Sequence, residues 1–273
     1  MESINIVHHA DCLDVLPAIE MASVGLVVAD PPYFRVLKES WDNQWPDEAA
    51  YLDWSLAWLR LVMRTLMPGG LCYIFGQVGK REHVWLHLMS RATAEFEFHD
   101  LIIWDRAVGY DRRDSFSPAY EQILVLKQSG ALSRFDKDAV REPYNAETQV
   151  RYLKDRRYLD KDKRRDYLEK GKFATNLWRV PSLKGTSHEK VGHPTQKPLA
   201  LLERIITSSS RAGDVMLDPF CGSGSSLVAA QKLGRRFIGI EADEKWVSCA
   251  RTRTLEVGCD DLCQPDGEGK ILI

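Results

Sequence analysis

The segment VVADPPYF, residues 27–34, ends an apolar run with residues whose types could do chemistry. Asp30 offers a carboxylate that can accept hydrogen bonds, and Tyr33 offers an aromatic ring that can stack on a flat ligand. Pro31 and Pro32 lack a backbone N–H and have a fixed φ, so they present carbonyl acceptors in set directions. Taken alone, the segment is equally compatible with an ordinary strand exit in which Tyr33 covers the core.

A second apolar run also ends in Asp-Pro, at LDPFCGSGSS, residues 217–226. Gly222 and Gly224 permit a tight turn, and the helix expected after them presents free N–H groups to a ligand. Glu241 lies 17 residues after Gly224, near the spacing at which an acid binds ribose in dinucleotide folds. The turn matches neither G-x-G-x-x-G nor a phosphate loop. It could be a plain strand–helix connection, but Glu241 favours a nucleoside-containing cofactor. The lack of a phosphate-binding loop favours a cofactor without a diphosphate.

Alternating apolar runs and helical patterns predict the elements that must position these residues. Strands are expected at 4–11, 25–32, 71–76, 99–106, 120–127, 214–220 and 235–243. Helices are expected at 47–67, where Pro-Gly-Gly ends the pattern, and at 79–92, 197–210, 225–234 and 244–256. This alternation predicts a doubly wound α/β fold.

Residues 128–192 interrupt the regular pattern, which indicates an insertion or small domain. Residues 151–172 hold ten Lys/Arg against five Asp/Glu, a charge of +5 that leaves −7 for the rest of a chain with a net charge of −2. Tyr152, Tyr158 and Tyr167 are interleaved with these charges. The segment is either a solvated helix with i,i+4 ion pairs or a surface that binds phosphates.

Composition narrows the class of protein. The 273 residues are 44% hydrophobic, which is enough for one large core, and no apolar run approaches the length that spans a bilayer. The N-terminus lacks the pattern of a signal peptide, so a cytoplasmic protein without membrane contact is expected. The six cysteines include no C-x-x-C pair, which favours reduced thiols and no metal site.

DPPY at 30–33 and DPFCGSGS at 218–225 together resemble the amino-methyltransferases of DNA. These enzymes use S-adenosylmethionine to methylate adenine at N6 or cytosine at N4. HPTQKPLALLERII at 193–206 is similar to the family's other cofactor motif, and the order of the three segments matches the permuted β group. The resemblance covers most of residues 4–256 and fades across about 128–190.

The resemblance implies a Rossmann-like methyltransferase sheet, mostly parallel and circularly permuted. Residues 1–127 and 193–258 would form the catalytic domain, 128–192 a variable target-recognition region, and 259–273 a flexible tail. In such a sheet the strand that ends near Asp11 neighbours the strand that ends at Glu241. The two ends of the chain should therefore meet in space.

The resemblance also assigns roles to matching residues. Asp30, Pro31, Pro32 and Tyr33 match the catalytic tetrapeptide. The residues implied for cofactor binding are Asp11, Asp30, His193, Thr195, Gln196, Lys197, Asp218, Phe220, Cys221, Gly222, Ser223, Gly224 and Glu241. Within this set, Glu241 matches the acid that binds the ribose hydroxyls, and Asp11 the acid near the cofactor's adenine. The residues from His193 to Lys197 match the segment that closes over the methionine end. The basic residues expected to contact DNA are Arg112, Arg113, Arg151, Lys154, Arg156, Arg157, Lys163, Arg164 and Arg165.

An adenine amino nitrogen is a poor nucleophile because its lone pair is delocalised into the ring. Asp30 would accept a hydrogen bond from one N–H and the Pro31 carbonyl from the other, which directs the lone pair toward the methyl group. The base must leave the duplex to reach the site, and Tyr33, with Phe34 beside it, would stack on it. This chemistry relies on positioning and needs neither a metal nor a covalent intermediate.

Asp at the first position and Tyr at the fourth resemble the adenine-N6 enzymes, so site-specific adenine methylation of DNA is predicted, with cytosine-N4 methylation as the alternative. An RNA amino-methyltransferase or a non-catalytic nucleic-acid-binding module would be less compatible with this motif order and with the intact pocket residues. Beside DNA, a homodimer and a restriction endonuclease are the partners that the resemblance raises. Residues 34–46 could be a lid over the site or a plain connector.

Overall fold

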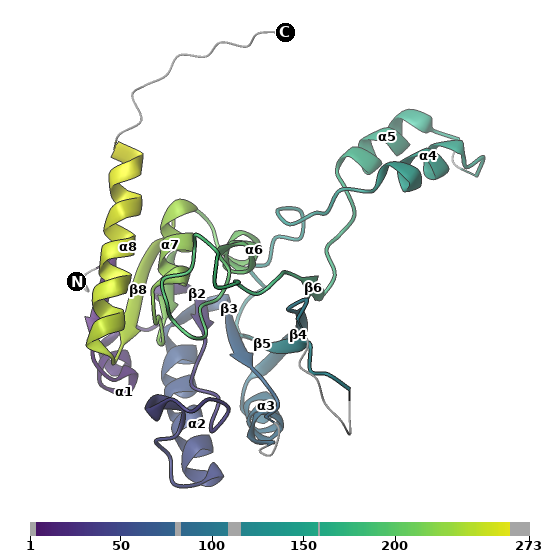
Figure 1. The fold of residues 1–273 in the computed structure, drawn as a ribbon. Helices are drawn as coiled ribbons and strands as arrows, with labels where there is room; N and C mark the ends of the chain where they lie inside the picture. The colour runs from purple at the N-terminus through teal and green to yellow at the C-terminus, as the bar shows by residue number, and fades with distance from the viewer. Residues whose placement is uncertain (1–3, 80–82, 109–115, 158, 263–273) are drawn as a thin grey trace.

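A computed structural model describes residues 4–79, 83–108, 116–157 and 159–262 of the chain. Its strands form one sheet in the order β1-β8-β7-β2-β3-β5-β4-β6 (Figure 1). Their bounds are β1 Ile6–His9, β2 Val24–Ala29, β3 Leu66–Gly76, β4 Glu97–Asp105, β5 Tyr120–Lys127, β6 Leu177–Arg179, β7 Val215–Asp218 and β8 Arg236–Glu241. The sheet is mostly parallel, and β5 alone runs antiparallel to its neighbours β3 and β4 among the pairs described.

The first and last strands of the chain lie side by side. His9 of β1 pairs in parallel register with Glu241 of β8, and β8 in turn pairs with β7. The carboxyl ends of these strands meet at one edge of the sheet, together with the end of β2. The predicted meeting of the two chain ends, and with it the circularly permuted order, is confirmed.

Helices cover both faces of the sheet, which gives the three layers of a doubly wound fold. Their bounds are α1 Cys12–Val15, α2 Glu48–Thr65, α3 Val84–Glu95, α4 Ala146–Lys154, α5 Lys161–Glu169, α6 Leu199–Ser209, α7 Ser225–Lys232 and α8 Glu244–Leu262, with 3-10 turns at Leu16–Ala18 and Ser40–Asp42. α1, α2 and α3 pack on one face, and α6, α7 and α8 on the other. In the described part of the chain, no helix has the length and apolarity to cross a membrane.

The start of β3 differs from the prediction. The helix pattern was expected to run to 67 and end at Pro-Gly-Gly, but α2 ends at Thr65 and β3 begins at Leu66. Pro68, Gly69 and Gly70 lie within the strand because Gly69 N and Gly70 O exchange hydrogen bonds with Gln128 beyond β5. Gly69 adopts φ +77°, and a Cβ there would lie 2.1 Å from the Leu132 carbonyl oxygen. This pairing with a distant strand is not visible in the local pattern.

The insertion is divided between the sheet and a projecting arm. Within 128–192, β6 joins the sheet as an edge strand beside β4, so this part is not separate from the catalytic domain. The arm carries α4 and α5 at its tip, well away from the sheet (Figure 1). At its base Glu142 pairs with Lys172, and Arg204 of α6 binds the Glu142 carboxylate at 2.8 Å. α8 continues to Leu262, past the predicted end at 256, and the rest of the predicted tail lies outside the described residues.

Candidate active site

The carboxyl ends of β2, β7 and β8 open onto one cleft of about 1680 Å³. Clefts at this edge of an open α/β sheet are where such folds bind ligands. Most residues predicted for the catalytic and cofactor sites line it, namely Asp11, Asp30, Pro31, Pro32, Tyr33, His193, Thr195, Gln196, Lys197, Asp218, Phe220, Cys221, Gly222, Ser223 and Glu241. The structure therefore brings together residues that lie up to 230 positions apart, because 241 − 11 = 230.

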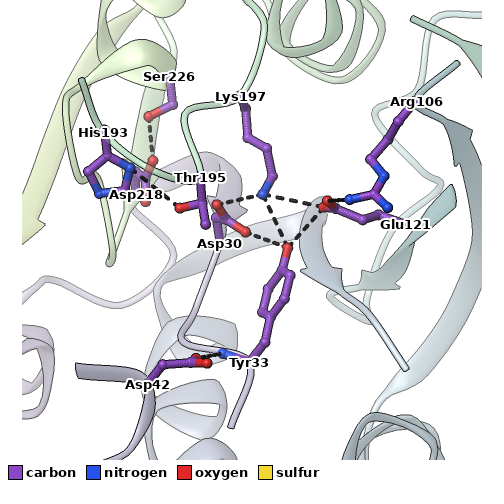
Figure 2. A network of polar contacts seen from close by, with 10 residues as sticks. All are labelled: Asp30, Tyr33, Asp42, Arg106, Glu121, His193, Thr195, Lys197, Asp218 and Ser226. Carbon is purple, nitrogen blue, oxygen red and sulfur yellow. Dashed lines mark hydrogen bonds and ion pairs between the residues drawn. The ribbon is translucent and has the colours of Figure 1, made fainter. Parts of the chain in front are cut away.

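Asp30 lies at the centre of a network of polar contacts (Figure 2). The Tyr33 hydroxyl donates to Asp30 Oδ1 at 2.6 Å, and Lys197 Nζ contacts Asp30 Oδ2 at 2.8 Å. Glu121 Oε2 lies 3.2 Å from the Tyr33 hydroxyl and 3.4 Å from Lys197 Nζ. Arg106 Nη1 donates to Glu121 Oε1 at 3.1 Å. Two carboxylates and two cations thus share one poorly solvated site.

The charges of this network reinforce one another. Burial, together with the negative charges of Asp30 and Glu121, raises the pKa of Tyr33 well above its ordinary value. Burial acts to lower the pKa of Lys197, but the same two carboxylates outweigh it and hold that pKa above its ordinary value. At neutral pH Tyr33 is therefore a hydroxyl donor and Lys197 an ammonium.

A buried acid, Asp42, shapes the segment that follows Tyr33. Asp42 Oδ1 accepts from Tyr33 N and Asp42 Oδ2 from Leu37 N, each at 2.6 Å. Between them Phe34 and Arg35 adopt φ +56° and +58°, a conformation that is uncommon for residues other than glycine. Asp42 thereby ties the start of segment 34–46 into a compact turn at the rim of the cleft. Whether the segment moves over a ligand stays a prediction.

Phe34 is among the residues that line the cleft, but its buried ring does not offer a second stacking surface. Its side chain is only 1% exposed, and its ring packs on the Tyr51 ring at a centroid distance of 5.2 Å. The left-handed turn points Phe34 into the core, which was not visible in the sequence. Tyr51 also donates to the Pro32 carbonyl at 2.6 Å. The Pro31 carbonyl accepts no hydrogen bond from the described residues, which leaves it available to a ligand.

The glycine turn forms the other half of the cleft. Gly222 adopts φ +49° and donates its N–H to Glu241 Oε2 at 2.9 Å. Gly224 adopts φ +78°, and a Cβ there would lie 2.8 Å from the Cβ of Ala250 in α8. Arg253, also in α8, donates to the Ser223 carbonyl at 2.6 Å. Glu241 and Arg253 therefore bind the turn at Gly222 and Ser223, and Gly224 packs against α8.

Asp218 and His193 flank this turn with unusual protonation properties. Burial raises the pKa of Asp218 to about 7, although the Ser226 hydroxyl and the Phe220 N–H both bind its carboxylate. Burial, and then the charge of Lys197, lowers the pKa of His193 to about 4. The His193 ring is neutral at pH 7 and packs edge-on against Trp246 at a centroid distance of 4.5 Å.

This half of the cleft fits an adenosyl cofactor. Glu241 offers a carboxylate that two backbone N–H groups, from Gly222 and Asp243, already orient. A Cβ on Gly222 would approach the His193 ring to 3.2 Å, so the bare glycine keeps the floor of the cleft open. Lining residues at this end are acidic or neutral, apart from Lys197 and Lys190, which suits a nucleoside better than a diphosphate.

Comparison with known proteins decides the family. Residues 24–252 match the sequence profile of the family described as DNA methylase, which comprises N6 and N4 methyltransferases. The chain belongs to the DNA methylase family. It is 32% identical over 256 residues to the Type II methyltransferase M1.MboII of Moraxella bovis, covering 92% of this chain and 96% of that protein. It is also 32% identical over 251 residues to the DNA adenine methyltransferase YhdJ of Escherichia coli K12, covering 90% and 81%.

Solved structures of DNA methylases share the fold. TTHA0409 of Thermus thermophilus, a putative DNA modification methylase, superposes with a TM-score of 0.64 at 27% identity and covers 92% of this chain and 95% of its own. The same protein has been solved in complex with S-adenosyl-L-methionine. The cytosine-N4-specific PvuII DNA methyltransferase superposes with a TM-score of 0.68 at 17% identity, covering 95% of this chain and 92% of its own. That likeness shows the fold alone.

Two of the residues that line the cleft of this DNA methylase also hold the structure around it. Gln196 turns its side chain to Val191 N and the Glu189 carbonyl, so it holds its own segment together. Asp11 lines the rim, where it caps α1 through Leu13 N at 2.8 Å. Arg112 and Arg113 lie outside the described residues. The remaining predicted DNA contacts lie on the arm, which the fold separates from the cleft (Figure 1).

Three cleft residues of this DNA methylase were missed by the sequence analysis: Glu121, Arg106 and Asp42. Glu121 follows Tyr120 in the strand YEQILVLK, where polar and apolar residues alternate only weakly. Arg106 directly follows the neighbouring strand β4, and Asp42 lies in a loop of mixed polarity. The one available signal for Glu121 was an acid near the start of a mainly apolar strand. Acids at such positions are common where the strand end is exposed. Only tertiary contact distinguishes Glu121, which is 7% exposed.

Proposed function

We propose that this DNA methylase transfers a methyl group from S-adenosylmethionine to the exocyclic N6 amino group of an adenine flipped out of DNA. One observation carries the proposal: the Asp30 carboxylate and the Tyr33 ring share a cleft with the glycine turn and Glu241. A target base at Asp30 and an adenosyl cofactor at Glu241 would therefore lie within one enclosure. That proximity converts methyl transfer into a positioned, single-site event.

The preference for adenine over cytosine has two supports. The tetrapeptide begins with Asp30, as in the adenine enzymes that the motif resembles, and one relative at 32% identity is named a DNA adenine methyltransferase. The fold does not separate the two targets, because a cytosine-N4 enzyme shares it. Cytosine-N4 methylation is thus the outcome that would correct this part of the proposal.

The chain's residues would act mainly as acceptors and as a stacking surface. Bound S-adenosylmethionine supplies a methyl group on a positively charged sulfur. Asp30 and the Pro31 carbonyl each accept a hydrogen bond from the amino group, which turns the nitrogen lone pair out of the ring plane. Tyr33 stacks on the base, a contact worth on the order of 1–3 kcal/mol. The nitrogen gains the methyl group and loses one proton, for which Asp30 is the adjacent base.

The arm is proposed to contact the DNA backbone. Three cations of the arm are exposed: Lys154 at the end of α4, Arg156 in the turn that follows, and Lys163 on α5. Arg157 and Arg165 instead form ion pairs with Asp155 and Asp162, so the solvated-helix interpretation describes part of the segment. Phosphate contacts of this kind would fix register and orientation and would leave the choice of sequence to other residues.

A product analysis tests the proposal. The protein is incubated with labelled S-adenosylmethionine and unmethylated DNA, and the DNA is digested to nucleosides that are separated and identified. Label in N6-methyladenine supports the proposal, and label in N4-methylcytosine replaces the target base. If no label enters any of the DNA sequences tested, DNA methylation is overturned as the activity of this chain, whether or not RNA becomes labelled.

A restriction endonuclease and a second copy of this chain are proposed as partners. Several relatives are named Type II methyltransferases, which supports a role beside a restriction endonuclease of the same site specificity. A homodimer is proposed by analogy with the family. Light scattering on the purified chain, with and without DNA, measures its mass, and a monomer under both conditions would remove the homodimer.

A further inference from the structure

A buried acid that the proposed reaction does not use lies beside the catalytic acid. Glu121 of β5 is 7% exposed, and its two oxygens face different partners. Arg106 binds Oε1 at 3.1 Å, while Oε2 faces the Tyr33 hydroxyl at 3.2 Å and Lys197 at 3.4 Å (Figure 2). Burying a second carboxylate near Asp30 is unfavourable unless it is paired and hydrogen-bonded, so its position calls for a reason.

In the network both oxygens of Asp30 already have a partner. Oδ1 accepts from the Tyr33 hydroxyl at 2.6 Å, and Oδ2 is bound by Lys197 at 2.8 Å. The proposed reaction requires Asp30 to accept a hydrogen bond from the target amino group. Each oxygen keeps a second lone pair, but the amino group would have to share Oδ1 with the Tyr33 hydroxyl or Oδ2 with Lys197, and it binds best where the present partner is redirected.

Tyr33 is the partner with an alternative. Its hydroxyl has one proton to donate and lies within hydrogen-bond distance of both carboxylates, Asp30 Oδ1 at 2.6 Å and Glu121 Oε2 at 3.2 Å. Rotation about the ring–oxygen bond redirects that proton without breaking a covalent bond. Lys197, by contrast, contacts both carboxylates at once and can stay in place.

We propose that Glu121 is a positioning residue which accepts the Tyr33 hydroxyl proton in a hydrogen bond when the target base enters, and so frees Asp30 Oδ1 for the amino group. The inference rests on the proposed function and deepens it. Arg106 is part of the device, because its bond to Oε1 keeps Oε2 turned toward Tyr33. Tyr33 keeps its proton throughout, and the redirected hydrogen bond leaves its ring free to stack on the base.

A purely structural ion pair is the alternative, and a double-mutant cycle separates the two. Glu121→Gln keeps the size of the side chain. Because Arg106 retains the amide oxygen, the amide NH2 faces Tyr33 and cannot accept its proton. Tyr33→Phe keeps the ring and removes the hydroxyl that occupies Asp30. The exposed acid Glu97, 44% exposed at its side chain, provides the control Glu97→Gln.

The measurement is the single-turnover rate of methyl transfer with saturating DNA and S-adenosylmethionine, alongside the dissociation constant of the cofactor. We expect Glu121→Gln to slow transfer about tenfold, the scale of one hydrogen bond, with cofactor binding unchanged. Tyr33→Phe leaves no hydroxyl on Asp30 Oδ1, so in that background the Glu121→Gln substitution should change the transfer rate by less than about twofold. The double variant should run at the Tyr33→Phe rate, because no hydroxyl remains to be moved.

Additive losses in the double variant would overturn the inference, since a structural defect is not relieved by a second substitution. A Glu121→Gln variant that transfers the methyl group as fast as the parent would also overturn it, because the hydroxyl would then leave Asp30 Oδ1 without help from Glu121. If Glu121→Gln fails to fold, Glu121→Asp keeps the charge, withdraws the oxygens from Tyr33, and should show a loss that Tyr33→Phe again relieves. An inactive parent would instead count against the proposed function and is seen before any variant is made.

Discussion

At the scale of single residues, the proposed reaction depends first on Asp30. In Asp30→Asn one of the two acceptor oxygens becomes an NH2 group, and the remaining one is contested by Tyr33 and Lys197. We expect the single-turnover rate of methyl transfer to fall about 100-fold, the scale at which one positioned polar group contributes to a transition state. The rate is measured at saturating cofactor, with the cofactor affinity of the variant determined by calorimetry, so that a loss in binding is not counted as a loss in transfer.

Asp53 offers a matched control for this substitution. It lies on α2 with its side chain 79% exposed, so Asp53→Asn alters the same chemical group without touching the cleft. Its transfer rate should equal that of the parent. An Asp30→Asn variant as fast as Asp53→Asn would remove Asp30 from the reaction.

Asp218 gives a prediction about pH at the same scale. Its pKa of about 7 in the folded chain exceeds the value near 4 of an unfolded chain. Between these values the folded state holds a proton that the unfolded state lacks, so this residue makes the free energy of unfolding fall as pH rises from about 4 to about 7. The slope from one such proton is at most about 1.4 kcal/mol per pH unit.

Comparison with Asp218→Asn isolates this effect, because the amide does not titrate. His193 acts in the opposite direction, since its lowered pKa makes stability rise with pH between about 4 and about 6.5. Subtracting the urea-unfolding curves of variant and parent at each pH cancels the His193 contribution. A difference that does not change between pH 4 and pH 7 would show that Asp218 is ionised over this whole range.

At the scale of elements, the turn between β7 and α7 depends on glycine for two separate reasons. In Gly224→Ala the backbone at φ +78° is strained and the new Cβ lies 2.8 Å from the Ala250 Cβ. Gly213 has a similar φ of +83° with no atom within 4 Å of its position, so Gly213→Ala carries the strain alone.

We expect Gly213→Ala to lower the free energy of unfolding by about 1–2 kcal/mol and Gly224→Ala by about 1–3 kcal/mol more. Chemical denaturation measures both. The contact with α8 also predicts that Gly224→Ala weakens cofactor binding, whereas Gly213→Ala leaves it unchanged. Equal stability losses in the two variants would mean that α8 yields to the added methyl group.

The elements that carry Asp30, Asp218 and Glu241 could be predicted because each ends an apolar run whose length and period are local properties. The adjacency of β1 and β8 followed from the motif order. Glu121 could not be predicted, since its role depends on Lys197, which joins it only after the chain has crossed the sheet. Phe34 was misplaced for a related reason. Phe34 and Arg35 adopt left-handed backbone conformations between the two N–H groups that the Asp42 carboxylate binds, and this turn decides which way Phe34 points.

At the scale of the whole molecule, the chain separates its functions in space. The cleft, which Asp30 and Glu241 both line, lies at one edge of the sheet. The basic arm projects from the body beyond β6 (Figure 1). The net charge of −2 is thus the sum of a positive arm and a negative remainder, with +5 in residues 151–172 and −7 in the rest of the chain. If the arm contacts DNA as proposed, this distribution would direct the arm toward the phosphates as the chain approaches the duplex.

The salt dependence of DNA binding tests this arrangement. Each phosphate contact contributes about 0.9 to the slope of log K against log salt concentration on duplex DNA. In Lys154→Gln combined with Lys163→Gln, two exposed cations of the arm are removed, so the slope should become shallower by about 2. Arg211→Gln combined with Lys232→Gln removes two exposed cations outside the arm, in the turn before β7 and at the end of α7, and should leave the slope unchanged. Fluorescence anisotropy on labelled duplexes from 50 to 200 mM salt, a range over which such contacts are resolved, gives both values.

Because phosphate contacts carry no base information, the arm variant should weaken binding to all sequences alike, and a loss confined to one sequence would instead place base recognition on the arm.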